Sequence, residues 1–491
     1  MGDLVLGIDL GTSGVGVVAQ TVDGQVAARA DHPLELHTPR PGWTEQHPDD
    51  WRSAAEGALR EVATAVGGDR VAAIALAGQM HGMAARDEQG RAVHPALLWN
   101  DQRTADEVAE IEARIGRERL VARTGNIAVT GFQLPKVLWL RRHQPEAFAR
   151  TRLVMLPKDD LGLHLTGEAV AEPCDASGTS AYHLASGSWD EEILAALDLD
   201  PGLWPRLVRS DAVVGGLRPA LAEQLGVPAD TPVIAGAGDN AAAATGLALG
   251  SAHAEVGSVS LGTSGVLQLP LADPTPDPLG RVHLFAHADG AFLLMGVTLA
   301  AAGSLRWYRD TFAPTRSFAE LVDEAASAPV GANGLTFKPY LAGERTPHMR
   351  ADLRGSFHGL SLATRHADVV RAVLEGVACS QRESLDVMTP LARPERLLAT
   401  GGGAVSDVWL GILADTLGLP LGRPVDPAGA PLEVGAAEGA AWLGWRALGQ
   451  APERSPRADV WFEPAPERAE AMEATYGRYR QLGVEALEAQ A

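Results

Sequence analysis

The chain has 491 residues, which is too many for one ordinary hydrophobic core and predicts two or three domains. Its content of 46% hydrophobic and 21% charged residues is typical of a globular protein. The net charge of −21 disfavours nucleic acids and anionic membranes as partners, so an anionic substrate needs a local site of amides, cations or a metal.

Cysteine usage and apolar runs narrow the expected setting. Cys174 and Cys379 are the only cysteines and have no metal-ligand spacing, which is typical of a cytoplasmic protein. Apolar runs such as VAAIALAG are far shorter than the roughly 20 residues of a membrane-spanning helix. Asp3 and an immediate strand near the start, without a basic segment, predict no signal peptide.

The first part of the chain predicts strands joined by tight turns. Residues 3–33 contain, in order, LVLGIDL, GTSG, VGVVAQTV, the hairpin signal Asp23-Gly24, and QVAARA. Residues 48–66 predict a helix, and VAAIALAG at 71–78 predicts a buried strand that ends in the loop QMHG. ALLWND at 96–101 is strand-like, and a helix is expected in RTADEVAEIEARIG, which follows it.

The same opening pattern returns in the middle of the chain. PVIAGAGDN predicts a strand and a glycine turn that lead into the alanine-rich helix AAAATGLAL. From Glu255 onward, VGSVSL, GTSG and VLQLPLA repeat the first hairpin. We therefore expect an N-terminal domain at 1–246, a C-terminal domain at 247–465 and a helical tail at 466–491.

The repeated LGTSG is the strongest sign of a ligand. Glycines let backbone N–H groups converge on an anion, and the hydroxyls of Thr and Ser add donors. A single copy is more simply an ordinary hairpin turn, but two copies at equivalent places predict one nucleotide held between two domains. The expected phosphate-binding residues are Gly11, Thr12, Ser13, Gly14, Gly262, Thr263 and Ser264.

Asp9 lies in the apolar run GIDLGT, where a carboxylate is costly to bury without a partner or a metal. The second copy has Ser260 at the matching place, so only the first turn carries a charge. This asymmetry suits one Mg²⁺ held through water between Asp9 and phosphates. An aspartate bonded to a local turn amide is the alternative interpretation.

Two further glycine sites have more than one interpretation. In ATGGGAVSDVWLGILADTLGLPL (399–421) a strand end, three glycines and a helix from about Ser406 suit an adenine ring, or form a plain strand-to-helix turn. GAGDNA at 236–241 matches G-x-G-x-x-A, so a nicotinamide or flavin enzyme with Glu255 as the ribose acid is a rival hypothesis. The rival leaves both LGTSG turns unexplained.

Three polar residues follow predicted strands, at the edge where open α/β sheets bind ligands. His81 and Asp101 are expected to contact a sugar, and Asp239 is expected to act on it. A lone carboxylate beside a hydroxyl is what a kinase needs as a general base. His81 taken alone would more often be a surface or core histidine.

Together these motifs resemble the FGGY family of carbohydrate kinases, and within it the branch that phosphorylates xylulose. The resemblance extends over nearly the whole chain, and AGQMHG and LLWNDQR are its most specific parts. It also includes PKVLWLRRH, LPKDDL, GAGDNAAAA, SLGTSG, YLAGERTPH, GSFHGL, RAVLEG and the GGG loop. It implies an α/β fold of two actin-like (ribonuclease H-like) ATPase domains with a nucleotide cleft between them.

The resemblance also implies roles for individual residues. Asp239 would be the general base for the terminal sugar hydroxyl, and Asp9 would serve Mg²⁺ and ATP. Met80 and His81 would contact a ketopentose, with Asn240 as a helper. The adenosine end of ATP would lie against Gly402, Gly403 and Ser406. The reaction would transfer the γ-phosphoryl group of ATP to the 5-hydroxyl of the sugar.

The sequence departs from the family pattern at two positions. Gly16 stands where the family usually has a lysine, so either nucleotide binding is weaker or another cation substitutes. Gln133 stands where a small hydroxyl residue or proline is usual. The open alternatives are a sibling kinase for another ketose or polyol, the dinucleotide oxidoreductase, and a non-enzymatic actin-like ATP-binding protein. A homodimer is left open.

Overall fold

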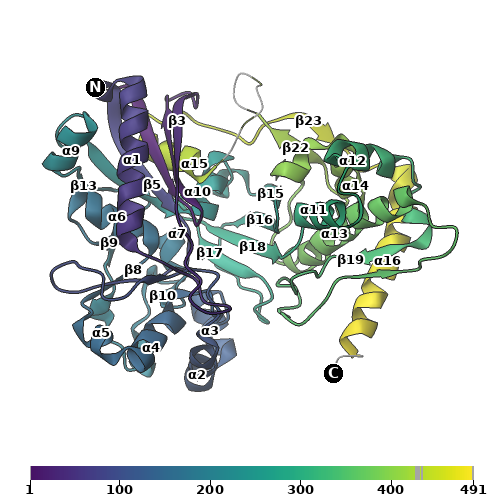
Figure 1. Ribbon diagram of the computed structural model, residues 1–491, viewed down its shortest axis with the longest axis horizontal. Helices are drawn as coiled ribbons and strands as arrows, with labels where there is room; N and C mark the ends of the chain where they lie inside the picture. The colour runs from purple at the N-terminus through teal and green to yellow at the C-terminus, as the bar shows by residue number, and fades with distance from the viewer. Residues whose placement is uncertain (1, 426–428, 430–431, 433–434, 489–491) are drawn as a thin grey trace.

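A computed structural model describes residues 2–425, 429, 432 and 435–488 of the chain. It has two lobes, each built on one mixed β-sheet with helices on both faces (Figure 1). The N-terminus lies in the first lobe, and the long C-terminal helix runs along the outside of the second (Figure 1).

The first sheet has the order β13-β14-β5-β1-β2-β3. Its central strands, β1 (Leu4–Leu10), β5 (Val71–Gly78) and β14 (Pro232–Gly238), are parallel and almost wholly buried, as their continuous apolar sequences predict. β2 (Gly14–Gln20) and β3 (Val26–Pro33) extend the sheet as an antiparallel hairpin, and β13 (Val213–Gly216) closes the other edge. The Asp23-Gly24 turn joins β2 to β3 as predicted, with φ of 92° at Gly24.

The second sheet repeats this arrangement. Its order is β17-β18-β16-β15-β21-β22-β23. The strands are β17 (His283–Ala286), β18 (Phe292–Thr298), β16 (Gly265–Leu271), β15 (Val256–Leu261), β21 (Arg396–Thr400), β22 (Leu421–Pro424) and β23 (Ala458–Phe462). Apart from β17, each neighbouring pair has the same direction as its counterpart in the first sheet. The predicted fold class of two repeated α/β domains is confirmed.

Helices cover both faces of the first sheet. α1 (Pro48–Val66), predicted at those bounds, packs on β2 and β3, with α6 (Pro157–Thr166) and α9 (Pro219–Leu225) beside it. α10 (Asp239–Gly246) and α15 (Ala436–Ala447) cover the other face. A Cβ on Gly439 would lie 1.7 Å from the carbonyl oxygen of Ala242, so the glycine permits this close helix contact. The segment 436–447, placed by our sequence boundaries in the C-terminal domain, therefore packs on the first sheet.

The second lobe is organised around α13 (His366–Met388), which is buried along most of its length. α11 (Ala302–Phe312), α12 (Phe318–Ala326) and α14 (Asp407–Leu417) pack near it, with the small hairpin β19 (Thr336–Lys338) and β20 (Ser356–His358). The predicted tail helix begins at Pro466 as α16 (Pro466–Glu488). Lys338 donates to the carbonyl oxygen of Tyr479 over 3.1 Å, which fastens the tail to this lobe.

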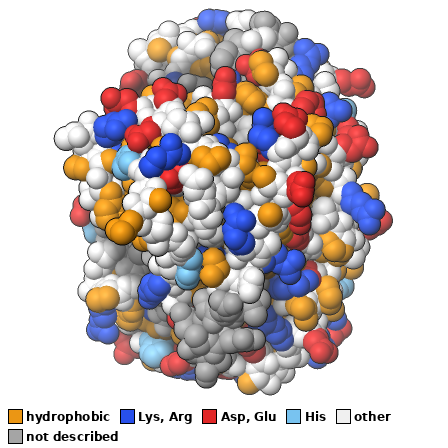
Figure 2. Space-filling view, turned by 90° about the vertical axis from the view of Figure 1, so that its right-hand side faces the viewer, with side chains coloured by type: hydrophobic (Ala, Val, Ile, Leu, Met, Phe, Trp, Pro, Cys, Tyr) orange, Lys and Arg blue, Asp and Glu red, His pale blue; other side chains and the backbone are white. Residues whose placement is uncertain are grey.

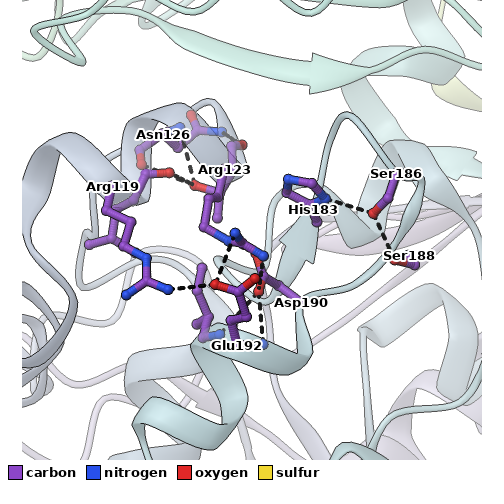
Figure 3. A network of polar contacts seen from close by, with 11 residues as sticks. Arg119, Arg123, Asn126, His183, Ser186, Ser188, Asp190 and Glu192 are labelled. Carbon is purple, nitrogen blue, oxygen red and sulfur yellow. Dashed lines mark hydrogen bonds and ion pairs between the residues drawn. The ribbon is translucent and has the colours of Figure 1, made fainter.

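In the view of Figure 1 a helical extension lies below the first sheet, and it contacts the second sheet. It contains α2 (Ala105–Ile115), α3 (Arg117–Thr124), α4 (Gln133–His143), α5 (Pro145–Arg150), α8 (Glu191–Ala196) and the hairpin β10 (Tyr182–His183) and β11 (Ser188–Trp189). Arg123 forms two hydrogen bonds with Asp190, and Arg119 pairs with Glu192, so α3 is fixed to α8 (Figure 3). Asn126, just after α3, donates to the carbonyl oxygen of Leu284 in β17 over 2.9 Å.

The remaining elements are short. They are β4 (Glu45–Gln46), β6 (Ala84–Arg86), β7 (Ala96–Leu97), β8 (Leu153–Met155), β9 (Val170–Ala171), β12 (Arg206–Leu207), α7 (Pro173–Ala176), and the 3-10 turns η1 (Gly68–Arg70), η2 (Pro201–Leu203), η3 (Ser251–His253), η4 (Ala332–Gly334) and η5 (Gly402–Val405). The strand-like run at 96–101 is thus a strand at only two residues. No helix in the described part of the chain is long and apolar enough to cross a membrane.

The surface carries the excess negative charge in mixed form. On the face seen in Figure 2, acidic and basic side chains are interspersed, with hydrophobic side chains scattered among them. Such a surface provides no broad field of one sign on this face. The surface charge on this face therefore does not indicate a binding site for a charged ligand.

Candidate active site

The two LGTSG turns occupy equivalent places in the two sheets. Each joins the central strand, β1 or β15, to its antiparallel neighbour, and each has a residue exposed to solvent, Ser13 or Thr263. The backbone amides of Ser13 and Ser264 form no hydrogen bond with residues that the structure describes. Open turns with free amides suit the oxygens of an anion such as a phosphate chain.

Three side chains from the first lobe hold Thr12 in place. Its hydroxyl donates to Gln79 Oε1 over 3.0 Å and accepts from Trp99 Nε1 over 2.9 Å. Gln46 Nε2 donates to the carbonyl oxygen of Thr12 over 2.8 Å. These contacts make the first turn a rigid feature, and the sequence alone did not predict Gln46, Gln79 or Trp99 as its supports.

Asp9 and Asp239 form an acidic centre beside the first turn. Asp9 Oδ1 is buried and has no hydrogen-bond partner among the described residues. Burial, and after it the nearby charges of Asp239, Glu438 and Asp31, raise the pKa of Asp9 to about 7. Burial also raises the pKa of Asp239 to about 6, against two hydrogen bonds donated by Asn240 over 2.7 and 2.9 Å.

This centre fits a divalent cation that keeps most of its water. An unpartnered buried carboxylate oxygen that faces other carboxylates is stabilised by a positive charge. No group of three or more His, Cys, Asp or Glu side chains in the described residues is arranged to hold a metal directly. Mg²⁺ typically uses one or two carboxylates together with water and substrate phosphates, so Asp9 alone suffices as its protein contact.

His81 lies in the loop that follows β5, where its φ is 70°. Its Nδ1 is 2.7 Å from the carbonyl oxygen of Gly178, and its ring stacks on Phe132 with centroids 4.5 Å apart. Burial lowers the pKa of His81 to about 3, so the ring is neutral at physiological pH. Nδ1 then carries the proton that it donates to Gly178, which leaves Nε2 as an acceptor for a hydroxyl group.

The other predicted sugar contacts divide into two groups. Met80 lies against the end of β14, because a Cβ on Gly238 would be 2.7 Å from Met80 Cγ, and Asn240 Nδ2 is 3.9 Å from Met80 Sδ. Met80, Asp239 and Asn240 are thus brought together. The described residues around Met80 form a buried apolar cluster that joins the two lobes: Phe132, Phe285, Met295 and Val297.

Asp101 is held elsewhere. It is fully buried, and its oxygens accept hydrogen bonds from the Thr44 amide over 2.7 Å and from the amide and side chain of Arg103. Three N–H groups, the amides of Thr44 and Arg103 and Nε of Arg103, thus donate to this carboxylate, which fixes the loop around Thr44. That Asp101 contacts the sugar stays a prediction.

A cavity in the second lobe suits a flat aromatic ring. It has a volume of about 590 Å³ and lies between α11, α12, η5 and α14. The predicted residues Gly402, Gly403 and Ser406 are part of its lining, and Ser406 also caps α14 by accepting from the Trp409 amide over 3.2 Å. Its remaining lining includes the apolar side chains Leu305, Phe318, Val322 and Val405.

The two departures from the family pattern have different surroundings. Gln133 is buried, accepts a hydrogen bond from Trp204 Nε1 over 2.9 Å and donates one to the carbonyl oxygen of Gly82. It therefore links the segments around Gly82 and Trp204. Gly16 is the partner of Asp9 in the β1–β2 pairing. A Cβ there would lie 3.0 Å from Asp31 Oδ1, so the position faces the acidic centre without supplying a charge.

Residues 4–246 match the N-terminal domain of the FGGY family of carbohydrate kinases, and residues 257–447 match its C-terminal domain. The xylulose kinase of Lactococcus lactis is 40% identical over 84% of this chain and 82% of its own, and that of Escherichia coli is 38% identical over 87% and 88%. The chain belongs to the FGGY family of carbohydrate kinases.

Solved structures agree with this membership. The xylulose kinase of Rhodospirillum rubrum superimposes with a TM-score of 0.90 at 30% identity, and the match covers 98% of each chain. The protein is therefore a sugar kinase rather than an oxidoreductase or a non-enzymatic ATP-binding protein. The sequence GAGDNA belongs to the strand–helix junction from β14 to α10, which carries Asp239.

Proposed function

We propose that this kinase transfers the γ-phosphoryl group of ATP to the 5-hydroxyl of D-xylulose. The observation that carries the proposal is Asp239, a carboxylate whose pKa is raised to about 6 beside Met80 and opposite the acidic Asp9. Support for the sugar comes from relatives that match most of this chain and are named xylulose kinases.

The proposed reaction needs one proton acceptor and a held phosphate chain. Asp239 takes the proton of the 5-hydroxyl while that oxygen attacks the γ-phosphorus, and the bond to the leaving ADP oxygen breaks. Asn240 keeps Asp239 oriented through two hydrogen bonds. The turns at 11–14 and 262–264 hold phosphate oxygens, and the cavity lined by Gly402 and Gly403 holds the adenine. A bound Mg²⁺ near Asp9 would neutralise the charge that develops on the phosphates.

A sugar panel tests the substrate. ADP release is measured with purified protein, Mg²⁺, ATP and a series of ketoses, aldoses and polyols. D-Xylulose is expected to give the highest kcat/KM. A clear preference for glycerol, gluconate or L-ribulose would overturn the proposed sugar and leave the family membership unchanged.

His81→Ala tests the sugar pocket. Loss of the Nε2 acceptor is expected to weaken transition-state binding by roughly 1–3 kcal/mol, seen as a lower kcat/KM for sugar. ATP affinity measured without sugar should hardly change, because the side chains that hold Thr12 in the first turn do not include His81. The matched control is His366→Ala, which removes an exposed histidine paired with Glu324. An equal loss of ATP and sugar affinity in His81→Ala would contradict the placement.

A further inference from the structure

Arg345 belongs to the motif YLAGERTPH, and the proposed function leaves it without a role. Its guanidinium makes no hydrogen bond or ion pair with any residue that the structure describes. Burial lowers its pKa, so the group is poorly hydrated. By contrast, Arg350 in the same segment pairs with Asp352. An unpaired and partly buried guanidinium in an acidic protein is costly unless it meets an anion.

The backbone around Arg345 is fixed to the strand that borders the second phosphate turn. Glu344 Oε1 accepts from the amides of Leu299 and Arg345, both over 2.8 Å. Thr346 forms two hydrogen bonds with Val297 at the end of β18. Thr298, between these contacts, pairs with Gly265, the first residue of β16 after the turn 262–264. Arg345 is therefore held at the same sheet edge as that turn.

The same segment also borders the sugar pocket. Val297 packs in the apolar cluster that contains Met80 and Phe132, next to His81. After burial and Lys136, the charge of Arg345 contributes to the lowered pKa of His81, and it acts likewise on His283. In Figure 1, β16 and β18 lie on the side of the second lobe that faces the first, which agrees with this position. Arg345 thus stands between the expected phosphate and sugar sites.

The phosphate site has need of such a cation. Gly16 supplies no side chain, and the three lysines of the chain are used elsewhere. Lys136 donates to backbone carbonyls that include His81, Lys158 is paired with Asp159, and Lys338 donates to Tyr479. Arg29, which lies across the sheet from the Asp9 region, is paired with Glu438. None of these cations is free to neutralise a phosphate.

We propose that Arg345 is a catalytic residue whose guanidinium binds the phosphoryl group as it passes from ATP to the sugar. The planar fork of arginine matches two phosphate oxygens, and its charge counts most in the transition state, when negative charge shifts between the attacking and leaving oxygens. This inference rests on the proposed kinase reaction, but it does not depend on which sugar is phosphorylated.

Arg345→Gln removes the charge and keeps much of the side chain's length and polarity. We expect kcat to fall roughly a hundredfold, while the KM for sugar changes little. Calorimetry gives a readout that is independent of turnover: the sugar should bind as in the wild type, and its phosphorylated product should bind roughly tenfold more weakly. Arg350→Gln is the matched control, since it removes an arginine of the same segment that is paired with Asp352, and it should keep wild-type values.

Two results would overturn the inference. A raised sugar KM with unchanged kcat would make Arg345 a sugar contact, and unchanged kcat and product binding would leave it no part in the reaction. Arg345→Lys is a second variant that keeps the charge, so it should lie between the wild type and Arg345→Gln; a lysine variant no better than glutamine contradicts an electrostatic role. If the panel selects another sugar, the same comparison is made with that sugar and its phosphate, so the two proposals fail separately.

Discussion

Asp239→Asn is expected to lower kcat by roughly 10²–10⁴-fold, the span that a general base contributes. Asparagine keeps the size and the hydrogen-bonding shape of the side chain, so Asn240 and Met80 keep their places. It cannot accept the proton of the sugar hydroxyl. Sugar and ATP binding should persist in calorimetry, which separates the chemical step from binding.

The wild-type pH profile provides an internal check on this assignment. Because burial raises the pKa of Asp239 to about 6, kcat should fall as the pH drops below about 6, where the base becomes protonated. Asp239→Asn should lose this dependence. Asp352→Asn, which removes an exposed carboxylate paired with Arg350, is the matched control and should keep both rate and profile. A near-normal kcat in Asp239→Asn would contradict the base assignment.

The repeated turn made much of the fold predictable from sequence. GTSG behind an apolar run recurs because the two sheets share one strand order, and the turn follows the central strand in each. Asp239 was also accessible to sequence reasoning, since a carboxylate directly after a buried strand lies at the edge where such sheets bind ligands. Local pattern and topology agree at these positions.

Other features depend on contacts that no local pattern contains. Asp101 follows the same kind of run, and its contacts with Arg103 and the Thr44 amide are decided by tertiary packing. Glu438 comes to the acidic centre on α15, a helix far along the chain that packs on the first sheet. Asp31, unlike Glu438, has a signal in the sequence. The hairpin register set by Asp23-Gly24 pairs it with Gly16, and Gly16 pairs with Asp9.

Asp9→Asn is expected to change both stability and the use of magnesium. In the folded protein the pKa of Asp9 is about 7, above its ordinary value of 3.8, so the folded state binds the proton more tightly than the unfolded state. The wild type therefore loses free energy of unfolding as the pH rises from about 4 to about 7. At pH 8 without metal, the asparagine variant should be more stable by roughly 2–4 kcal/mol, and this difference should vanish near pH 3.

The same substitution, Asp9→Asn, should lower kcat although it raises the free energy of unfolding. Loss of the carboxylate that orients the cation is expected to lower kcat by roughly 10²–10³-fold at low Mg²⁺, which corresponds to several kcal/mol of transition-state stabilisation. Raising Mg²⁺ should recover part of that rate, because metal binding is an equilibrium that concentration can shift, whereas Asp239→Asn should not respond. The measurements are kcat across a Mg²⁺ series for both variants and denaturant unfolding from pH 3 to 8. Rescue of Asp239→Asn instead of Asp9→Asn would reverse the two roles. An Asp9→Asn variant that is less stable than the wild type at pH 8 would show that the ionised Asp9 carboxylate stabilises the fold through a structural contact and does not destabilise it.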